Sequence, residues 1–181
     1  MLPSDQAMAL LAILIAEAPN EVLEIGTYMG HTTRLMAENL ESATIHTVDL
    51  PEAFSHDNRA ADPSSLVKDD FHLIARRVVG REYRTRAAAK RIRQHFADTA
   101  TWDFREAGCP TFFFIDGSHT YEYCKNDSEK CFELCAGRGV FLWHDCDKNH
   151  PGVRRLIREW RAEGRDIKVI SDTSLAYWKS N

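Results

Sequence analysis

The chain has no strong excess of charge of either sign. Its 181 residues include 23 Lys and Arg and 27 Asp and Glu, which leaves a formal net charge of -4. Proteins that bind nucleic acid usually carry a basic surface, so this balance argues against a nucleic-acid partner. One segment is basic, residues 76–93, but Tyr83 is its only aromatic residue. We expect a solvated face there; the alternative is a patch for an acidic substrate or a partner surface.

Long hydrophobic runs are absent as well. The most apolar stretch, residues 7–16, is too short to cross a bilayer and follows Asp5 rather than basic residues, which argues against a targeting segment. Pro3 and Ser4 are typical of a helix start, and Pro19 ends the pattern. The sequence therefore predicts an N-terminal helix within residues 1–18 and no membrane partner.

Paired cysteines of the zinc-binding type are missing. The five cysteines are an odd number and include no Cys-x-x-Cys pair, which favours a reducing, cytoplasmic location. Three of them, Cys124, Cys131 and Cys135, share one face of a helix predicted over residues 121–136. We expect them to pack in the core rather than bind a ligand.

The dinucleotide-binding fingerprint Gly-x-Gly-x-x-Gly is not found either. After Gly26, Tyr28 and His31 occupy the places of its second and third glycines. An oxidoreductase that uses NAD is therefore disfavoured, although such enzymes share the fold class and the acidic residue after a second strand.

The chain has instead a strand, a turn with two glycines and a helix. Residues 22–25 predict a buried strand and residues 29–39 predict the helix. Gly26 and Gly30 would let a ligand approach the main chain, and the N–H groups of the first helical turn favour an anionic group. Glu24 would accept a hydrogen bond from a ligand ammonium. These features fit an amino-acid-like ligand; a strand–turn–helix that binds nothing is the alternative.

Further apolar segments predict a sheet with acidic residues at its strand ends. Strands are expected at residues 44–48, 92–96, 111–115 and 139–143, and a closing hairpin at residues 166–170 and 175–178. Ligands bind beyond the carboxyl ends of such strands, so side chains there should converge. Two carboxylates suit Mg²⁺, and one after the second strand suits a ribose. The strand-end acids are Glu24, Asp49, Asp98, Asp116 and Asp145.

These motifs resemble those of a known family. The pattern Glu-x-Gly-x-x-x-Gly at residues 24–30 resembles the first motif of class I S-adenosylmethionine-dependent methyltransferases, especially the catechol O-methyltransferase type. Asp98 and Thr99 resemble the family's adenine-contacting stretch. Asp-Gly-Ser-His-x-Tyr at residues 116–121 and Gly-Val-x-x-Trp-His-Asp at residues 139–145 resemble a bacterial branch of small O-methyltransferase-like proteins. The resemblance covers nearly the whole chain.

The resemblance implies one domain over residues 1–181. Its fold would be α/β, a Rossmann-like, doubly wound, seven-stranded sheet in a three-layer α/β/α sandwich. The sheet would be mostly parallel, with the last strand antiparallel. A loop at residues 51–66 and a helix near residues 69–79 would belong to an insertion or lid over residues 51–90, which also holds the basic segment.

The resemblance also implies a cofactor and a metal. S-adenosylmethionine would be bound by Glu24, Gly26, Thr27, Tyr28, Gly30, Thr32, Asp49, Asp98, Thr99 and Asp116. A divalent metal, Mg²⁺ or another, would be bound by Asp116, His144 and Asp145. His144 is included because Cys146 replaces the family's amide ligand, and an imidazole shifts the preference toward a transition metal. Asp116 and Asp145 hydrogen-bonded to backbone N–H groups, with no ion, are the alternative.

His119 stands where metal-dependent relatives carry a lysine base. We predict that His119, Asp116 and Asp145 are catalytic: His119 removes the proton of a small hydroxylated acceptor, oriented by Asp116 or the metal, which then attacks the sulfonium methyl group. A cofactor-binding protein without methyl transfer and an NAD-dependent oxidoreductase are the competing hypotheses. The sequence does not name the acceptor, and a homo-oligomer is left open.

Overall fold

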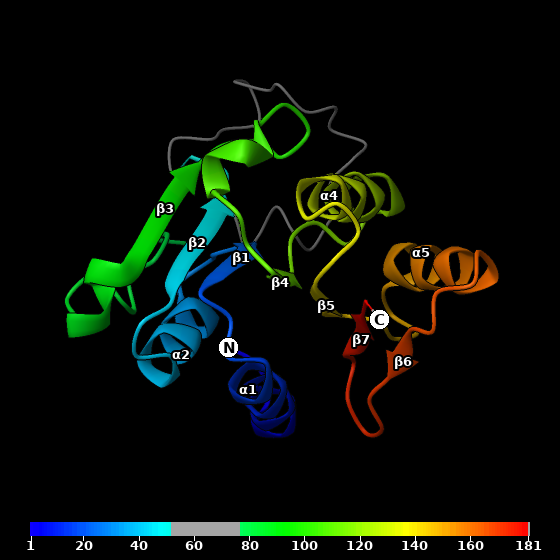
Figure 1. Ribbon diagram of the computed structural model, residues 1–181, viewed down its shortest axis with the longest axis horizontal. Coiled ribbons are helices and arrows are strands. Elements are labelled where there is room, and N and C mark those ends of the chain that lie inside the picture. Colours follow the sequence, from blue (N-terminus) through cyan, green and yellow to red (C-terminus); the bar gives the residue numbers. More distant parts are fainter. Residues whose placement is uncertain (52–76, 181) are drawn as a thin grey trace.

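Among the described residues, the fold is built on one seven-stranded sheet. The computed structural model describes residues 1–51 and 77–180 (Figure 1). The order across the sheet is β3-β2-β1-β4-β5-β7-β6. The strands are Glu21–Ile25 (β1), Thr44–Asp49 (β2), Ile92–Phe96 (β3), Phe112–Ile115 (β4), Val140–Trp143 (β5), Lys168–Val169 (β6) and Ala176–Lys179 (β7).

The direction of the strands places the candidate site residues at one edge of the sheet. Strands β1 to β5 pair in parallel, and β7 runs antiparallel between β5 and β6. The doubly wound, mostly parallel sheet and the antiparallel last strand are thus confirmed. The strand order reverses between β1 and β4, which is where open α/β sheets bind their ligands.

Helices cover both faces of the sheet. The side chains of α1 and α2 pack on one face, and those of α4 and α5 pack on the other, which confirms the three-layer arrangement. No helix among the described residues combines the length and the apolar composition needed to cross a bilayer. The helices are Ser4–Glu17 (α1), His31–Asn39 (α2), Tyr121–Leu134 (α4) and Pro151–Ala162 (α5), with short 3-10 turns at Ala87–Arg91 (η2) and Phe104–Ala107 (η3).

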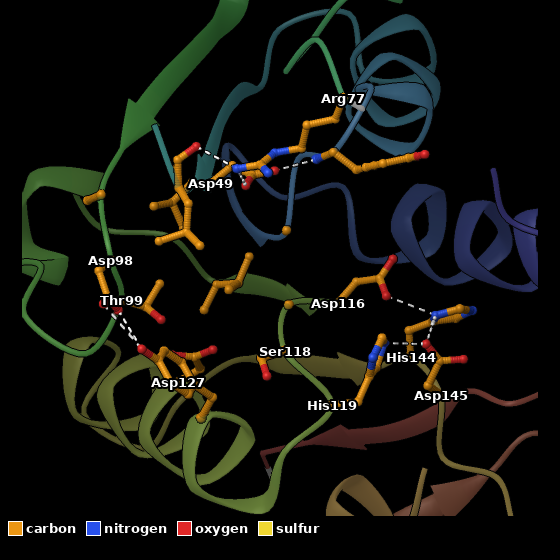
Figure 2. Close-up of a pocket in the computed structure, with 18 of the residues that line it drawn as sticks. Asp49, Arg77, Asp98, Thr99, Asp116, Ser118, His119, Asp127, His144 and Asp145 are labelled. Atoms are coloured by element: carbon orange, nitrogen blue, oxygen red, sulfur yellow. Dashed lines mark hydrogen bonds and ion pairs between the residues drawn. The ribbon is translucent and has the colours of Figure 1, made fainter. Parts of the chain in front are cut away.

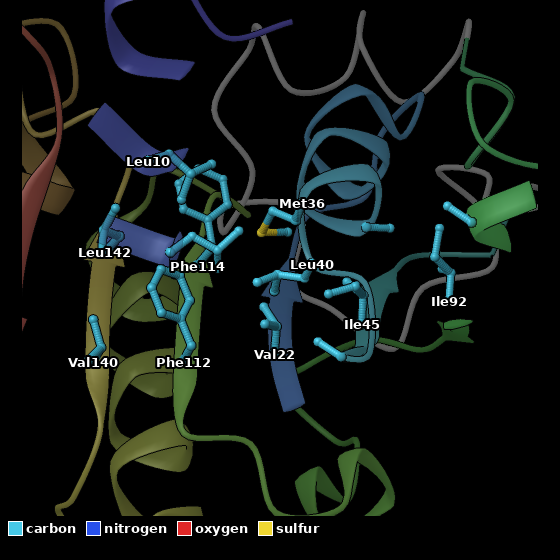
Figure 3. Packing of buried hydrophobic residues seen from close by; sticks show 14 of the residues in the cluster. Leu10, Val22, Met36, Leu40, Ile45, Ile92, Phe112, Phe114, Val140 and Leu142 are labelled. Atoms are coloured by element: carbon cyan, nitrogen blue, oxygen red, sulfur yellow. The ribbon is translucent and has the colours of Figure 1, made fainter. Parts of the chain in front are cut away.

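Alternation along the strands gives each face its own core. Phe112 and Phe114 of β4 belong to the cluster that includes Leu10 of α1 and Met36 of α2 (Figure 3). Phe113, between them in sequence, faces the opposite cluster under α4 and α5. The period of two in a strand produces this division. Because both faces are covered, the central strands are apolar throughout, as expected of buried parallel strands.

The cysteines of α4 confirm the packing prediction. Cys124 and Cys131 are buried in the cluster between the sheet and the helices α4 and α5, and Cys135 is partly buried against it. Burial raises the pKa of the Cys124 thiol and that of the Cys131 thiol. Both thiols therefore remain protonated, consistent with a purely packing role.

The basic segment departs from the predicted solvated face at two arginines. Arg91 donates to the carbonyl oxygen of Ala37 at 2.6 Å and so satisfies the C-terminal end of α2. Arg77 is buried. Residues 77–79 are not helical, so the predicted helix over residues 69–79 does not extend to its expected end; its remainder and the loop at residues 51–66 lie outside the described residues.

Leu142 provides a test of the core on the α1 and α2 face. Its side chain is fully buried, so Leu142→Ala should lower the free energy of unfolding by about 2–5 kcal/mol through lost contacts and a residual cavity. Ile15→Ala is the matched control, because it removes three carbons from a side chain that is 55% exposed and should cost less than about 1 kcal/mol. Denaturant unfolding measures both; equal costs would contradict this packing.

Candidate functional site

A cavity of about 320 Å³ lies at the carboxyl ends of the parallel strands (Figure 2). Its volume is within the range of small-molecule sites, about 300–1,000 Å³. The predicted site residues that line it are Gly26, Tyr28, Asp49, Asp98, Thr99, Asp116, His119, His144 and Asp145. Residues that were not assigned a role from sequence also line it, among them Arg77, Ser118, Tyr123 and Asp127.

A smaller cavity of about 100 Å³ adjoins the first. Tyr28, Asp116 and His144 line both. Thr27 and Thr32 line only the smaller one, beside the first turn of α2. The N-terminal end of a helix favours an anionic group, so this cavity suits the carboxylate end of an amino-acid-like ligand.

Gly26 brings the main chains of β1 and β4 into close contact. Its φ is +97°, and a Cβ there would lie 2.0 Å from the carbonyl oxygen of Asp116. Gly26 N donates to the Val48 carbonyl at 2.9 Å, and Asp116 N donates to the Ile25 carbonyl at 2.9 Å. Only glycine fits both the backbone conformation and the contact. The start of the glycine turn, residues 26–30, is therefore fixed to both neighbouring strands.

Glu24 lies below the site rather than in it, which corrects the predicted contact with a ligand ammonium. The residue is fully buried and lines neither cavity. Its Oε2 accepts hydrogen bonds from Thr33 and from Thr47, the latter at 2.6 Å. Burial raises the pKa of Glu24 to about 8, despite these hydrogen bonds. Glu24 therefore ties β1 to β2 and α2 beneath the glycine turn.

Gly30 is also corrected, from a ligand contact to a packing position. It lines neither cavity, and its φ is +84°. A Cβ there would lie 2.6 Å from Cδ1 of Tyr83. The Tyr83 hydroxyl donates to Gln94 of β3, and Gln94 Nε2 donates to Thr27 Oγ1 at 3.1 Å. Because Gly30 has no side chain, the ring of Tyr83 fits against it. This ring connects the segment after residue 77 to the glycine turn.

Asp49, the predicted ribose ligand, ends β2 with both carboxylate oxygens engaged. Tyr28 N donates to Oδ2 at 2.6 Å, and the Arg77 guanidinium lies 3.0 Å from Oδ1. Burial raises the pKa of Asp49, and the charge of Arg77 opposes that rise. Arg77 also donates to the Leu50 carbonyl at 2.9 Å. An arginine expected on a solvated face therefore holds this acid in place.

The end of β3 meets α4 at the opposite side of the cavity. The Tyr123 hydroxyl donates to Asp98 Oδ1 at 3.0 Å, and Ala100 N donates to the same oxygen at 2.9 Å. Thr99 hydrogen-bonds to Asp127, which is 1% exposed and whose pKa burial raises to about 7. Tyr123 and Asp127 are four residues apart, so one helix face delivers both. The spacing of four residues is therefore the pattern in the sequence that could have indicated that Tyr123 and Asp127 both reach the cavity.

His144 joins the two acids at the ends of β4 and β5. Its Nδ1 lies 2.9 Å from Asp116 Oδ1 and 2.9 Å from Asp145 Oδ2. His119 Nε2 lies 2.8 Å from the same Asp145 oxygen. Figure 2 shows these four side chains together at one end of the cavity. The predicted catalytic and metal-binding residues therefore form one contiguous group.

The charges in this group stabilise one another. Burial opposes the charged form of His144, but Asp116 and Asp145 outweigh it and raise the pKa of His144 to about 10. Burial also opposes ionisation of Asp145, yet the hydrogen bonds from His119 and His144 hold its pKa well below the usual range. At neutral pH an imidazolium therefore faces the Asp145 carboxylate.

Two further residues, Cys146 and His150, lie near this group. Cys146, in the position of the family's amide ligand, packs against the apolar cluster on the α4 and α5 face and lines neither cavity. His150 directly precedes α5, and its Nδ1 lies 3.6 Å from Asp145 Oδ1 and 2.9 Å from Asp147 Oδ1. Its ring centroid is 4.5 Å from that of His119. No local sequence pattern indicated that His150 would reach the site.

Glu24 makes the stability of the fold depend on pH. In the folded protein the pKa of Glu24, about 8, lies above its ordinary value of 4.5. The stability that Glu24 contributes is therefore fully present below about pH 4.5 and is lost as the pH rises through 8. Glu24→Gln has no group that ionises, so its free energy of unfolding should not fall in this pH range. Relative to wild type, the variant should gain a few kcal/mol of stability as the pH rises, since one pKa unit corresponds to about 1.4 kcal/mol. Unfolding measured at pH 5 and pH 9 gives the change. Glu133→Gln, whose parent side chain is 70% exposed, is the control and should leave the pH profile unaltered.

Gly26→Ala tests the contact between β1 and β4. Gly164→Ala is its matched control, because Gly164 has φ +96° but nothing within 4 Å of an added Cβ. Both variants carry the cost of a left-handed alanine, about 1 kcal/mol. Gly26→Ala should lose several kcal/mol more, because the added carbon meets backbone. Similar unfolding free energies for the two variants would contradict the close approach.

Comparison with known protein families gives one match. A family described as "Methyltransferase domain" matches residues 23–146. No curated protein matches the chain significantly in sequence.

Solved structures share the fold. The O-methyltransferase TomG from Streptomyces achromogenes, in complex with SAM, is 16% identical, with a TM-score of 0.66 over 100% of this chain and 82% of that one. Cofactor-bound Rv0187 from MTB is 15% identical, with a TM-score of 0.65 over 100% and 83%. SAH-bound PaMTH1 from Podospora anserina is 15% identical, with a TM-score of 0.63 over 99% and 80%. Since the family model spans more than half of the chain, the protein belongs to the methyltransferase domain family and is a class I methyltransferase.

Proposed function

We propose that the protein transfers a methyl group from S-adenosylmethionine to a hydroxyl oxygen of a small molecule. The observation that carries this proposal is the contiguous group of His119, Asp145, His144 and Asp116 at one end of the cavity formed by the glycine turn and the strand ends. The structures of TomG and PaMTH1, with their SAM and SAH, support the choice of cofactor.

The two cavities together suit the shape and charge of this cofactor. The smaller cavity, beside the first turn of α2, would take the methionine carboxylate. Asp49, held by Arg77, would accept from the ribose hydroxyls. The end lined by Asp98 and Thr99 would take the adenine. Asp116 lines both cavities, so its carboxylate would lie close to the sulfonium cation of a cofactor that extends from one cavity into the other.

His119 and Asp145 form a base and its orienting partner. The carboxylate, 2.8 Å from His119 Nε2, fixes the ring and favours a proton on that nitrogen. The second ring nitrogen, Nδ1, would then take the proton of the acceptor hydroxyl. Asp145 stabilises the imidazolium that results, as a buried carboxylate does for the histidine of a hydrolase triad.

The reaction is a single displacement at carbon. The bound cofactor would supply an electrophilic methyl group on its sulfonium sulfur. His119 removes the proton of the acceptor as the oxygen–carbon bond forms and the carbon–sulfur bond breaks, with the bonding electrons going to sulfur. The residues of the cavity hold the two reactants in line, and positioning of this kind contributes a large part of the rate.

The family's metal site does not fit the residues between Asp116 and Asp145. An oxygen-ligated Mg²⁺ would need the gap between the two carboxylates and the amide that follows the second acid. Nδ1 of His144 lies in that gap at 2.9 Å from each acid, and the side chain at the amide position belongs to Cys146, which packs into the apolar cluster. No step of the proposed reaction is routed through a metal. Asp116, His144 and Asp145 each offer one ligand atom, and these atoms lie within 4.8 Å of one another, so a transition-metal ion with His144 as a ligand stays a proposal.

Substitution of His119 and Asp49 separates chemistry from cofactor binding. His119→Gln should lower kcat by about 100-fold or more, since general bases contribute about 10²–10⁴, and should leave the Kd for S-adenosylmethionine unchanged. Asp49→Asn should instead raise that Kd by about tenfold or more, because a hydrogen bond to a charged group is lost. The Kd is measured by calorimetry.

Methyl transfer is measured as S-adenosylhomocysteine release with a panel of catechols, phenols and aliphatic alcohols. His95→Gln removes a histidine that lies outside both cavities and is the control for kcat. Cofactor binding without release of product for any acceptor would count against the proposal and favour a cofactor-binding protein without methyl transfer. A normal kcat in His119→Gln would remove His119 from the mechanism.

A further inference from the structure

A second set of ligand-type side chains shares Asp145 with the group described above. His119, Asp145 and His150 each offer one ligand atom, and these atoms all lie within 4.8 Å of one another. His119 comes from the loop after β4, Asp145 from the end of β5 and His150 from the start of α5. We propose that these three residues form a site for a zinc-type divalent ion, and that occupation of the site withdraws His119 from proton transfer.

The spacing of the ligand atoms fits a tetrahedral ion. His119 Nε2 lies 2.8 Å from Asp145 Oδ2, and His150 Nδ1 lies 3.6 Å from Asp145 Oδ1. Ligands about 2.0–2.1 Å from a tetrahedral zinc ion are about 3.4 Å apart, so each histidine nitrogen lies near that distance from one of the two carboxylate oxygens. Small rotations of the side chains would bring three donors onto one ion.

The chemistry of the donors selects the class of ion. Two imidazoles and one carboxylate suit zinc and other first-row transition metals, whereas Mg²⁺ prefers oxygen ligands. Asp147 Oδ1 lies 2.9 Å from the same nitrogen, His150 Nδ1, so a second carboxylate is at hand to complete the coordination. Two negative charges also offset the positive end of α5, where His150 lies.

The site is open to ions in solution. The exposed fractions of the side chains are 18% for His119, 16% for Asp145 and 27% for His150. Asp116, His144 and Asp145 form another group of ligand-type side chains, in which Nδ1 of His144 lies 2.9 Å from each acid. Asp145 therefore faces an imidazole on its inner side and the new site on its outer side.

Binding of an ion to the site would block the proposed reaction at Nδ1 of His119. A neutral imidazole that binds an ion through Nε2 keeps its proton on Nδ1, the nitrogen that must accept the proton of the acceptor. This regulatory step rests on the proposed function, whereas binding of the ion does not. His150 has no part in the proposed reaction, so the two roles of the cluster are separable by substitution.

Equilibrium dialysis against Zn²⁺, with the full chain and no cofactor, tests the site directly. Wild-type protein should bind one ion, His150→Gln should lose about tenfold or more in affinity, and His95→Gln should bind as wild type does. Mg²⁺ should not compete. Zinc affinity that is the same in His150→Gln as in wild type would overturn the site. Melting temperatures of the variants confirm that each is folded.

Methyl-transfer assays test the regulatory step. Without metal, His150→Gln should match wild-type activity; with Zn²⁺, wild-type activity should fall at the concentrations at which the ion binds, and His150→Gln should resist. Stimulation by Zn²⁺, or inhibition equal in both proteins, would overturn the regulatory step. If metal-free wild-type protein shows no methyl transfer at all, the proposed function fails, and the dialysis result still decides whether the ion site exists.

Discussion

The close approach of Gly26 to the main chain of Asp116 is the constraint on which the site depends. With no side chain between them, the ends of β1 and β4 meet, and the turn after β1 is fixed against the loop after β4. The first of these segments borders both cavities, and the second leads to His119. One backbone contact therefore sets the distance between the part of the site suited to a cofactor and the part suited to proton transfer.

The second constraint is electrostatic, because five strands end in acids at one edge of the sheet. The fold compensates each of them separately, and Asp98 accepts hydrogen bonds from the Tyr123 hydroxyl and from Ala100 N. Arg77 pairs with Asp49, His144 lies between Asp116 and Asp145, and burial keeps Glu24 protonated at neutral pH. The acids therefore do not repel one another as unpaired carboxylates would. Five of them can lie at this edge of the sheet before any ligand binds.

The strands and the convergence of their ends were predictable, because both follow from apolar segments and from the rule that parallel strands present their carboxyl ends together. The direction of Glu24 was predictable in principle: alternation places it with Val22 on the face covered by α2, away from the cavity beyond the strand end. Arg77 was not, because it reaches the site through a contact with Asp49, which is distant in the sequence. His150 contacts Asp145, a near neighbour in the sequence, but no motif marks that contact.

The histidine that we propose as the base can also bind a metal, which a lysine at that position would do poorly. The family resemblance places a lysine at the position of His119, and a lysine ammonium is a poor ligand for a metal at neutral pH because its pKa is about 10.4. An imidazole is both a base near neutral pH and the commonest metal ligand. Once Asp145 orients such a base and His150 stands 4.5 Å from its ring, the geometry that activates the base is also the geometry of an incomplete ion site. The sensitivity to transition metals that we propose thus follows from the choice of a histidine as the base.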